Sequence, residues 1–318
     1  MIDYLKILCK DSEYSKRLFK NPLLIMYSKN EKFKNKLIIE KEFIKQATYI
    51  KSYKEILFCF FTKNDFFTKL EILVKPHYYF NENLHNANDF KAVNCINILT
   101  EIKDVFNLPI TDLSIINIEF GVNFRSSINI KDLISYAIYQ ERNQFINSSD
   151  NLSFSKISSN SNPKGEENNY KRVKFYAKGV QFPQYTNINT GRLEIKSKES
   201  KYINKLDIYT CQDLLKKSTY LKLAEVLKEE FKKILILDID NKGQNLSSKE
   251  LLKLNNYKQN TTWVKYIQGS RNLFSRHKKD YFRILDKTEN NIHQKTYSVI
   301  NIKLNELIKG CADSNYIY

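Results

Sequence analysis

The sequence predicts an α+β protein in which an antiparallel sheet, flanked by helices, is followed by a basic helical region. Segments rich in β-branched and aromatic residues dominate the chain before about residue 200. From about residue 210 the apolar residues recur at helical spacing, with many basic residues between them. We therefore expect an α+β domain over residues 1–206 and a basic helical domain over residues 207–318.

Strands are expected where β-branched and aromatic residues alternate with polar residues or form short apolar runs. The polar break KNDF allows the second and third of these segments to form a hairpin. In chain order the segments are IDYLKILC (2–9), KEILFCFFT (54–62), FFTKLEILVKP (66–76), LSIINIEFGVNF (113–124), KRVKFYAKGVQF (171–182) and GRLEIKSKES (191–200).

Two helices are expected within the first domain, at about 88–106 and 130–143, and Asn88 or Asp89 is the candidate cap of the first. The Ser/Asn-rich segment 147–170 is expected to be a mobile loop. After residue 210 we expect two helices before residue 240. A further helix should begin with a capping box at Ser247 or Ser248, and a basic amphipathic helix should cover 272–287.

The acidic and basic residues are strongly unbalanced. Lys and Arg number 52 against 35 Asp and Glu, which gives a formal net charge of +17 over 318 residues. An excess of this size favours an anionic partner, with nucleic acid first and an acidic membrane surface second. Solubility alone is the alternative reason for such an excess.

Cysteine usage and hydropathy favour a cytoplasmic protein without a membrane segment. The five cysteines form no CxxC pair, which argues against a disulfide framework and against a structural zinc site. The first apolar run is too short for a signal peptide. No stretch approaches the roughly 20 apolar residues that a membrane span requires.

Three carboxylates lie inside strand-like runs, namely Glu71, Glu119 and Glu194. A charge in an apolar strand costs free energy unless it is solvated, paired or bound to a cation. For any one of the three, a solvated face or a lysine partner is an adequate explanation. Together they suggest a site for Mg²⁺ or Mn²⁺, which prefer carboxylate oxygens and can offset the charge of a phosphodiester.

The segment 171–182 contains a tyrosine between two lysines. Period-2 alternation places Lys174, Tyr176 and Lys178 on the polar face of the expected strand. Nearby cations would favour the phenolate of a tyrosine and so make it a better nucleophile. The same lysines would hold a phosphate. Since the chain has 21 tyrosines, this role depends on the neighbours of Tyr176.

Histidines offer at most a minor contribution to a metal site. No His-hydrophobic-His pair occurs among the four histidines, which excludes a two-histidine site on one strand. His85 in NLHNANDF is a candidate for one ligand, and an ordinary histidine of a surface loop is the alternative.

Several of these segments, in this order, resemble the gene II/X replication initiators of filamentous phages and related plasmids, which are divergent relatives of the HUH endonucleases. The segments are MIDYLKI, KLEILVKP followed by HN, IINIEFGVNF, KFYAKG and GRLEIKSKESKYINKL. The resemblance covers roughly residues 1–285. It implies a protein that nicks one DNA strand at an origin and becomes joined to the 5′ phosphate through a tyrosine. The 3′-hydroxyl that is left would prime rolling-circle synthesis.

The resemblance also implies roles for individual residues. The nucleophile of the family's Y-x-K strand is Tyr176, followed by Lys178, and its R-x-E strand is represented by Arg192 and Glu194. The acidic strand residue is Glu119, and the carboxylate of the E-I-x-x-x-P strand is Glu71. The chain departs from the pattern at position 117, where an asparagine replaces the usual arginine, and in the length of the loop before the tyrosine.

The expected function is therefore a metal-dependent DNA nickase and ligase that initiates replication. Tyr176 would attack the phosphate, and Glu119, Glu194 and either Glu71 or His85 would hold the metal. The expected phosphate ligands are Lys174, Lys178, Arg192 and Lys196. The partners would be single-stranded and duplex origin DNA, with a host helicase or polymerase as further partners. A non-catalytic origin- or operator-binding protein remains the alternative. An RNA-binding module is a third possibility, for which HYYF (77–80) is a weak signal.

The helix expected at 272–287 has an apolar side and a basic side. Its outward cations are expected to be Arg276, Lys278, Lys279 and Arg283. They would contact DNA phosphates, or they would form an ordinary solvated surface.

Overall fold

The computed structural model describes residues 1–27, 46–147, 154–158 and 169–310. Within them, one twelve-stranded sheet has the order β12-β7-β8-β9-β10-β11-β6-β1-β5-β4-β3-β2, and its neighbouring strands pair antiparallel. The strands are β1 (Ile2–Cys9), β2 (Ile25–Met26), β3 (Tyr49–Tyr53), β4 (Ile56–Lys63), β5 (Phe66–Val74), β6 (Ser114–Arg125), β7 (Ala137–Gln140), β8 (Asn143–Asn147), β9 (Ser155–Ser158), β10 (Arg172–Tyr176), β11 (Thr190–Ser197) and β12 (Ile234–Ile236).

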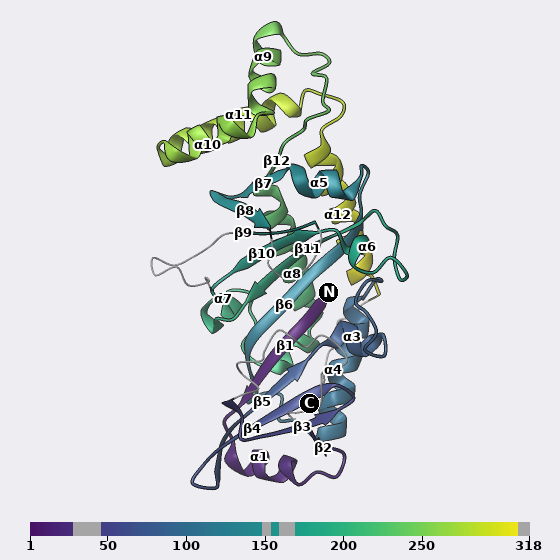
Figure 1. The fold of residues 1–318 in the computed structure, drawn as a ribbon. Coiled ribbons are helices and arrows are strands. Elements are labelled where there is room, and N and C mark those ends of the chain that lie inside the picture. The colour runs from purple at the N-terminus through teal and green to yellow at the C-terminus, as the bar shows by residue number, and fades with distance from the viewer. Residues whose placement is uncertain (28–45, 148–153, 159–168, 311–318) are drawn as a thin grey trace.

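Helices lie between these strands and dominate the chain after β11 (Figure 1). The expected α+β class with a large antiparallel sheet is therefore confirmed. The helices are α1 (Ser12–Phe19), α3 (Pro76–Phe80), α4 (Ala92–Phe106), α5 (Ile130–Tyr136), α6 (Lys178–Gln181), α7 (Ser200–Asn204), the 3₁₀ helix η2 (Cys211–Leu215), α8 (Lys217–Lys232), α9 (Ser248–Tyr257), α10 (Asn260–Gln268), α11 (Arg271–Leu285) and α12 (Ile292–Ile308).

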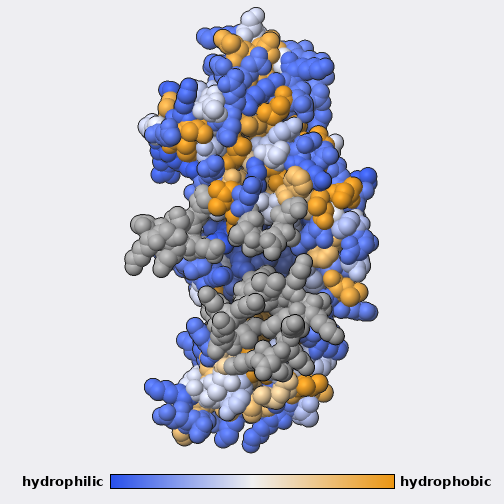
Figure 2. Space-filling view, in the orientation of Figure 1, coloured by the Kyte–Doolittle hydropathy of each residue, from blue (hydrophilic) through white to orange (hydrophobic). Residues whose placement is uncertain are grey.

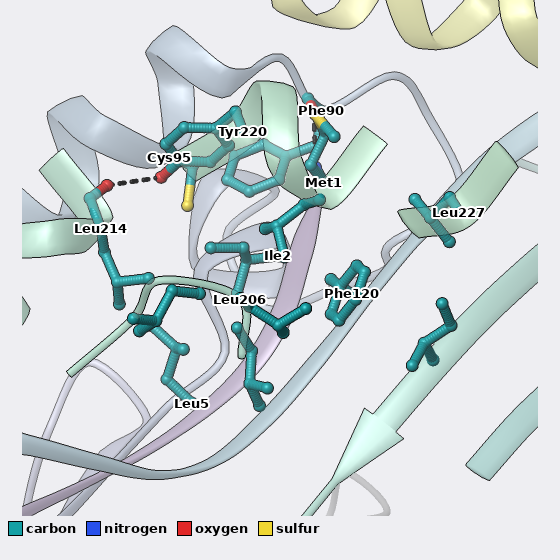
Figure 3. Packing of buried hydrophobic residues seen from close by; sticks show 14 of the residues in the cluster. Met1, Ile2, Leu5, Phe90, Cys95, Phe120, Leu206, Leu214, Tyr220 and Leu227 are labelled. Carbon is teal, nitrogen blue, oxygen red and sulfur yellow. Dashed lines mark hydrogen bonds between the residues drawn. The ribbon is translucent and has the colours of Figure 1, made fainter. Parts of the chain in front are cut away.

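The main core lies between the central strands and the helices α4, α8 and α12 (Figure 1). Strands β1 and β6 contribute Ile2, Leu5 and Phe120 to this core, where they pack near Tyr220 and Leu227 of α8 (Figure 3). The Tyr220 hydroxyl donates to the carbonyl of Leu214 at 2.8 Å, so the one polar atom of this ring is satisfied inside the core. The sheet therefore has one face covered by helices, and its other face is available for polar side chains.

A second apolar cluster holds α9, α10 and α11 together at one end of the molecule (Figure 1). Trp263, Tyr257 and Tyr281 are buried in it, and Leu235 of β12 and Tyr139 of β7 join it to the end of the sheet. By contrast, α8 and α12 belong to the main core. Residues after 207 therefore do not pack as one separate unit, because their first and last helices complete the core of the sheet.

Several expected elements have other boundaries or another form. The helix expected at 88–106 begins at Ala92 with Lys91 as its N-cap, and residues 137–140 of the second expected helix form β7. Between residues 211 and 239 the two helices are the short 3₁₀ helix η2 and the long helix α8, and they are followed by an unexpected strand, β12, which pairs with β7. Of the loop expected at 147–170, residues 155–158 form β9, and residues 148–153 and 159–168 lie outside the described residues. Two expectations are confirmed: the hairpin of β4 and β5, and the capping box at Ser247.

Candidate functional site

The side chains of β6, β10 and β11, at the centre of the sheet, alternate between its two faces around residues 118–124, 172–176 and 192–196. In β6, Phe120 and Val122 enter the helix-covered core, so Glu119 lies on the opposite face. Leu193 and Ile195 of β11 also enter that core. The same alternation therefore gathers the polar side chains of neighbouring strands on the face away from the helices, and Figure 2 shows hydrophilic surface recessed in the middle of the molecule.

A cluster of three carboxylates forms on this face. One oxygen from each of Asp3, Glu119 and Glu194 lies within 4.8 Å of the other two. The side chains of Asp3 and Glu194 are each 3% exposed, and that of Glu119 is 13% exposed. We call these residues the carboxylate cluster. Asp3, which the sequence analysis did not identify, lies where β1 has an irregular register against β6.

Cations on the neighbouring strands compensate the charge of the carboxylate cluster. The register of β10, β11 and β6 places Lys174 opposite Glu194 and Lys196 opposite Glu119. The corresponding N···O distances are 3.6 Å and 3.1 Å. The pKa of Glu119 falls to about 2 although burial raises it, because Lys196 and Lys174 favour the charged form.

Arg192 is a buried cation at the centre of the site. Its Nη2 forms a close ion pair with Asp3, its Nε donates to Glu194 at 3.2 Å, and its Nη1 donates to Asn123 Oδ1 at 2.6 Å. A Cβ at Gly121 would lie 2.5 Å from the carbonyl oxygen of Leu193 and 3.0 Å from this guanidinium. Arg192 therefore holds two of the carboxylates in place, and its buried position does not suit direct contact with a DNA phosphate.

Tyr176 ends β10 beside the carboxylate cluster. Its hydroxyl donates to Glu194 Oε2 at 3.1 Å, and the side chain is buried. Burial, followed by Glu194 and Glu119, raises the pKa of Tyr176 well above its usual value. The expectation that the two lysines favour the phenolate is therefore wrong for this arrangement, because the hydroxyl faces a carboxylate.

Lys178 lies after the strand and not on it. The chain leaves β10 at Ala177 and forms the short helix α6, where Gly179 packs so closely that a Cβ would lie 2.2 Å from the carbonyl oxygen of Asn187. The Nζ of Lys178 donates to Asn86 Oδ1 at 2.5 Å and to Gln181 Oε1 at 2.9 Å. Burial lowers the pKa of this lysine to about 7.

His77, in the short helix α3 after β5, faces the carboxylate cluster. The amide nitrogen of Asn81 donates to the carbonyls of His77 and His85, which fixes its orientation and leaves Asn88 Oδ1 as an acceptor. His77 Nε2 therefore donates to Asn88, at 2.8 Å, and Nδ1 faces Asp3 Oδ1 at 3.2 Å. Burial holds the pKa of His77 well below its usual value.

A second tyrosine is electrostatically connected to the cluster. Burial raises the pKa of Tyr78, which follows His77 in α3, to about 12, and the charges of Glu194 and Glu119 contribute in the same direction. Tyr78 is more exposed than Tyr176. It is therefore the tyrosine against which a role for Tyr176 must be tested.

Two expected metal ligands lie outside the carboxylate cluster. Glu71 of β5 is held by Lys6 and Lys69, each at 2.7 Å. His85 stacks on Tyr185, and its Nδ1 accepts from the backbone N–H of Ala87 at 3.3 Å. The structure thus brings together Tyr176, Glu119 and Glu194, and it adds Asp3 and His77 in place of these two residues.

The four cations expected on the outer side of α11 have different environments. Arg276 and Lys279 are exposed. Lys278 is turned inward, where its Nζ donates to the carbonyl of Lys233 at 2.5 Å, and burial lowers its pKa to about 8. Arg283 is exposed but pairs with Asp280 at 2.7 Å. The expectation that all four point outward is therefore wrong for Lys278.

Comparisons with known proteins give one structural similarity. No protein-family model and no curated protein matches the chain. Among solved structures, the rolling circle replication initiator protein from Geobacillus stearothermophilus aligns with 74% of this chain and 84% of its own, at 10% identity and a TM-score of 0.41. At this level the similarity by itself assigns no activity. No helix among the described residues combines the length and apolar character that a membrane span needs.

Proposed function

We propose that this protein initiates replication by nicking and rejoining one DNA strand through Tyr176, with a divalent cation bound at the carboxylate cluster. The observation that carries this proposal is the 3.1 Å hydrogen bond from the Tyr176 hydroxyl to Glu194, a member of that cluster. Glu194 would thus serve both as the proton acceptor of the nucleophile Tyr176 and as part of the candidate metal site.

The donor set of the site fits a hard divalent cation. Three carboxylates each place an oxygen within 4.8 Å of the other two, and oxygen ligands of this kind suit Mg²⁺ or Mn²⁺. His77 Nδ1, 3.2 Å from Asp3 Oδ1, offers a nitrogen beside the same carboxylates. Asp3, Glu119 and Glu194 would hold the ion. A bound cation would offset the charge that now raises the pKa of Tyr176 and the charge of a phosphate.

The proposed reaction exchanges one phosphodiester for another. The Tyr176 oxygen attacks the phosphorus, and its proton passes to Glu194, which already accepts the hydrogen bond from this hydroxyl. The bond from phosphorus to the 3′-oxygen breaks, and that oxygen takes up a proton and becomes a free hydroxyl. Because the phosphotyrosyl ester replaces the phosphodiester without hydrolysis, the reverse attack by a 3′-hydroxyl rejoins the strand.

The nearby cations would have two roles: one orients protein carboxylates, and another attracts the DNA phosphate. Arg192 positions Asp3 and Glu194, since its guanidinium is already bonded to both. Lys178 lies beside the tyrosine, with its Nζ 5.5 Å from the Tyr176 ring centroid, and in its charged form it would attract the phosphate to the tyrosine without contacting it directly. The formal net charge of the whole chain, +17, would attract the DNA.

The test is incubation of the protein with supercoiled DNA that carries the sequences flanking its own gene, with and without Mg²⁺ or Mn²⁺. We expect nicked circles with protein attached at the 5′ end, only when the metal is present. Peptide mapping of the digested adduct should identify Tyr176. Binding of the DNA without nicking or adduct in either metal would contradict the proposal and favour a non-catalytic DNA-binding protein.

A further inference from the structure

Three aromatic rings meet beside the tyrosine site, and we call them the aromatic platform: His85, Phe182 and Tyr185. The His85 and Tyr185 rings stack with their centroids 3.9 Å apart and 29° between their planes. Phe182 lies 6.4 Å from Tyr185 and 6.5 Å from His85. Neither Phe182 nor Tyr185 packs into the apolar clusters of the described residues, and Tyr185 is 39% exposed. Core packing therefore does not account for these rings.

Lys178 connects the aromatic platform to the tyrosine site. Its Nζ lies 4.7 Å from the centroid of the Phe182 ring and 5.5 Å from that of Tyr176. The same Nζ donates to Asn86, the residue after His85, and Asn86 Nδ2 lies 3.5 Å from Asp3 Oδ1. Lys178 and Asn86 thus place the aromatic platform next to the carboxylate cluster.

We propose that the aromatic platform stacks against an unpaired nucleobase of the DNA strand that lies next to the scissile phosphate. Aromatic side chains beside a cation are the usual means of holding single-stranded nucleic acid, because every base has a face that can stack. Burial, followed by His77 and Lys178, lowers the pKa of His85, which favours a neutral ring at neutral pH. The proposal rests on the proposed function for the place of the phosphate, whereas the stacking can be tested without cleavage.

The experiment measures binding of a fluorescein-labelled oligothymidylate of about 12 nucleotides to the full-length protein in EDTA, where no cleavage is expected. Tyr185→Ala should weaken binding by about 5- to 150-fold, the range for loss of one stacked base. Tyr185→Phe keeps the ring and should bind within about twofold of wild type. Tyr209→Ala removes a tyrosine that is 56% exposed and lies outside the platform, and it should also leave affinity unchanged.

Two further arms make the assignment specific. Affinity for a duplex of the same length should not change in Tyr185→Ala, because paired bases are not free to stack. If thermal melting shows that this variant is unfolded, His85→Ala tests the same stack from its other side. Wild-type affinity of a folded Tyr185→Ala or His85→Ala for the oligothymidylate would overturn the proposal. Tighter binding of oligouridylate than of oligothymidylate would overturn it in favour of RNA.

Failure of this proposal can be separated from failure of the proposed function. Adduct formation with metal reports on Tyr176, whereas binding of the labelled oligothymidylate in EDTA reports on the aromatic platform. An adduct in wild type together with unchanged affinity in Tyr185→Ala would leave the nickase standing and remove the platform. No adduct, together with lost affinity in Tyr185→Ala, would leave a binding platform for single strands and remove the nickase.

Discussion

The central face of the sheet and the outer side of α11 both carry several charges, but those on the sheet are buried and those on α11 are largely exposed. On the sheet, Asp3 and Glu194 are buried, and buried Arg192 is bonded to both. On α11, Arg276 and Lys279 are exposed. A single buried charge changes the protonation of its neighbours, as Glu194 does for Tyr176, whereas an exposed charge is screened by water and salt. Substitutions on the sheet should therefore act individually and strongly, and those on α11 weakly and together.

The largest effect is expected from Tyr176→Phe, which removes only the hydroxyl that donates to Glu194. The covalent adduct should disappear, and non-covalent DNA binding should stay within about twofold, because Arg192 still satisfies Glu194. Tyr78→Phe is the matched control and should keep the adduct. Electrophoresis with labelled DNA in a denaturing gel measures the covalent adduct of both variants. An adduct that persists in Tyr176→Phe and is lost in Tyr78→Phe would transfer the role to Tyr78.

The next effect concerns the carboxylates. Glu119→Gln, Glu194→Gln and Asp3→Asn should each reduce nicking by on the order of 100-fold, since loss of supporting partners alone typically costs 10- to 100-fold. An amide is a poorer ligand for a hard cation. Binding of Mn²⁺, followed by electron paramagnetic resonance, should weaken in parallel.

Glu71→Gln is the control for the carboxylate series. It makes the same change of charge on β5, where the carboxylate is paired with Lys6 and Lys69 and lies outside the carboxylate cluster. Its affinity for Mn²⁺ should match that of wild type, although the loss of a buried partner of Lys6 should lower stability. Nicking at the wild-type rate in EDTA would disprove the metal requirement.

Part of the carboxylate cluster can be predicted from alternation along single strands. Period 2 indicates that Glu119, Glu194 and Tyr176 face away from the apolar side of their own strands, and this is where they lie. Alternation does not tell which strands are neighbours. Glu71 has the same local pattern, but β1 separates its strand from β6, and Lys6 of β1 neutralises it.

The residues that sequence reasoning missed depend on long-range pairing or on a local irregularity. Asp3 reaches the cluster because the register of β1 shifts between Ile2 and Tyr4, and a regular strand would not indicate this. His77 follows β5 in the PHYYF segment, and its contact with Asp3 spans 74 residues, which no local pattern indicates. Lys178 leaves the strand pattern because the chain turns at Ala177.

An intermediate effect is expected from Lys278→Met, which tests the one cation of α11 that behaves like those of the sheet. The pKa of Lys278 is about 8 in the folded protein and 10.5 in its ordinary state. Unfolding therefore takes up a proton between these values, and stability rises with pH in that window. At one pKa unit per about 1.4 kcal/mol, the variant should gain at most about 3 kcal/mol below pH 8.

This gain should fade as the pH approaches 10.5, where the lysine is neutral in both states. The Lys233 carbonyl keeps the N–H of Glu141 as a donor at 3.1 Å, so the substitution leaves it satisfied. Urea unfolding at pH 7 and pH 10 measures the difference. An equal stability change at both pH values would show that burial does not perturb this lysine.

The smallest effect is expected from Arg276→Gln combined with Lys279→Gln, which removes two exposed cations of α11 that have no acidic partner among the ion pairs of the described residues. If each contacts a phosphate, the slope of log K against log salt for duplex DNA should fall by about 1.8, at about 0.9 per contact. Origin and unrelated duplex should weaken by similar factors, because phosphates carry no sequence information. Lys10→Gln with Lys16→Gln makes the same charge change near α1, at the other end of the molecule, and serves as the control (Figure 1). Equal slopes for the two double variants would mean that α11 contributes only to the general charge of the protein, and the comparison between sheet and helix would then be one between a site and an ordinary surface.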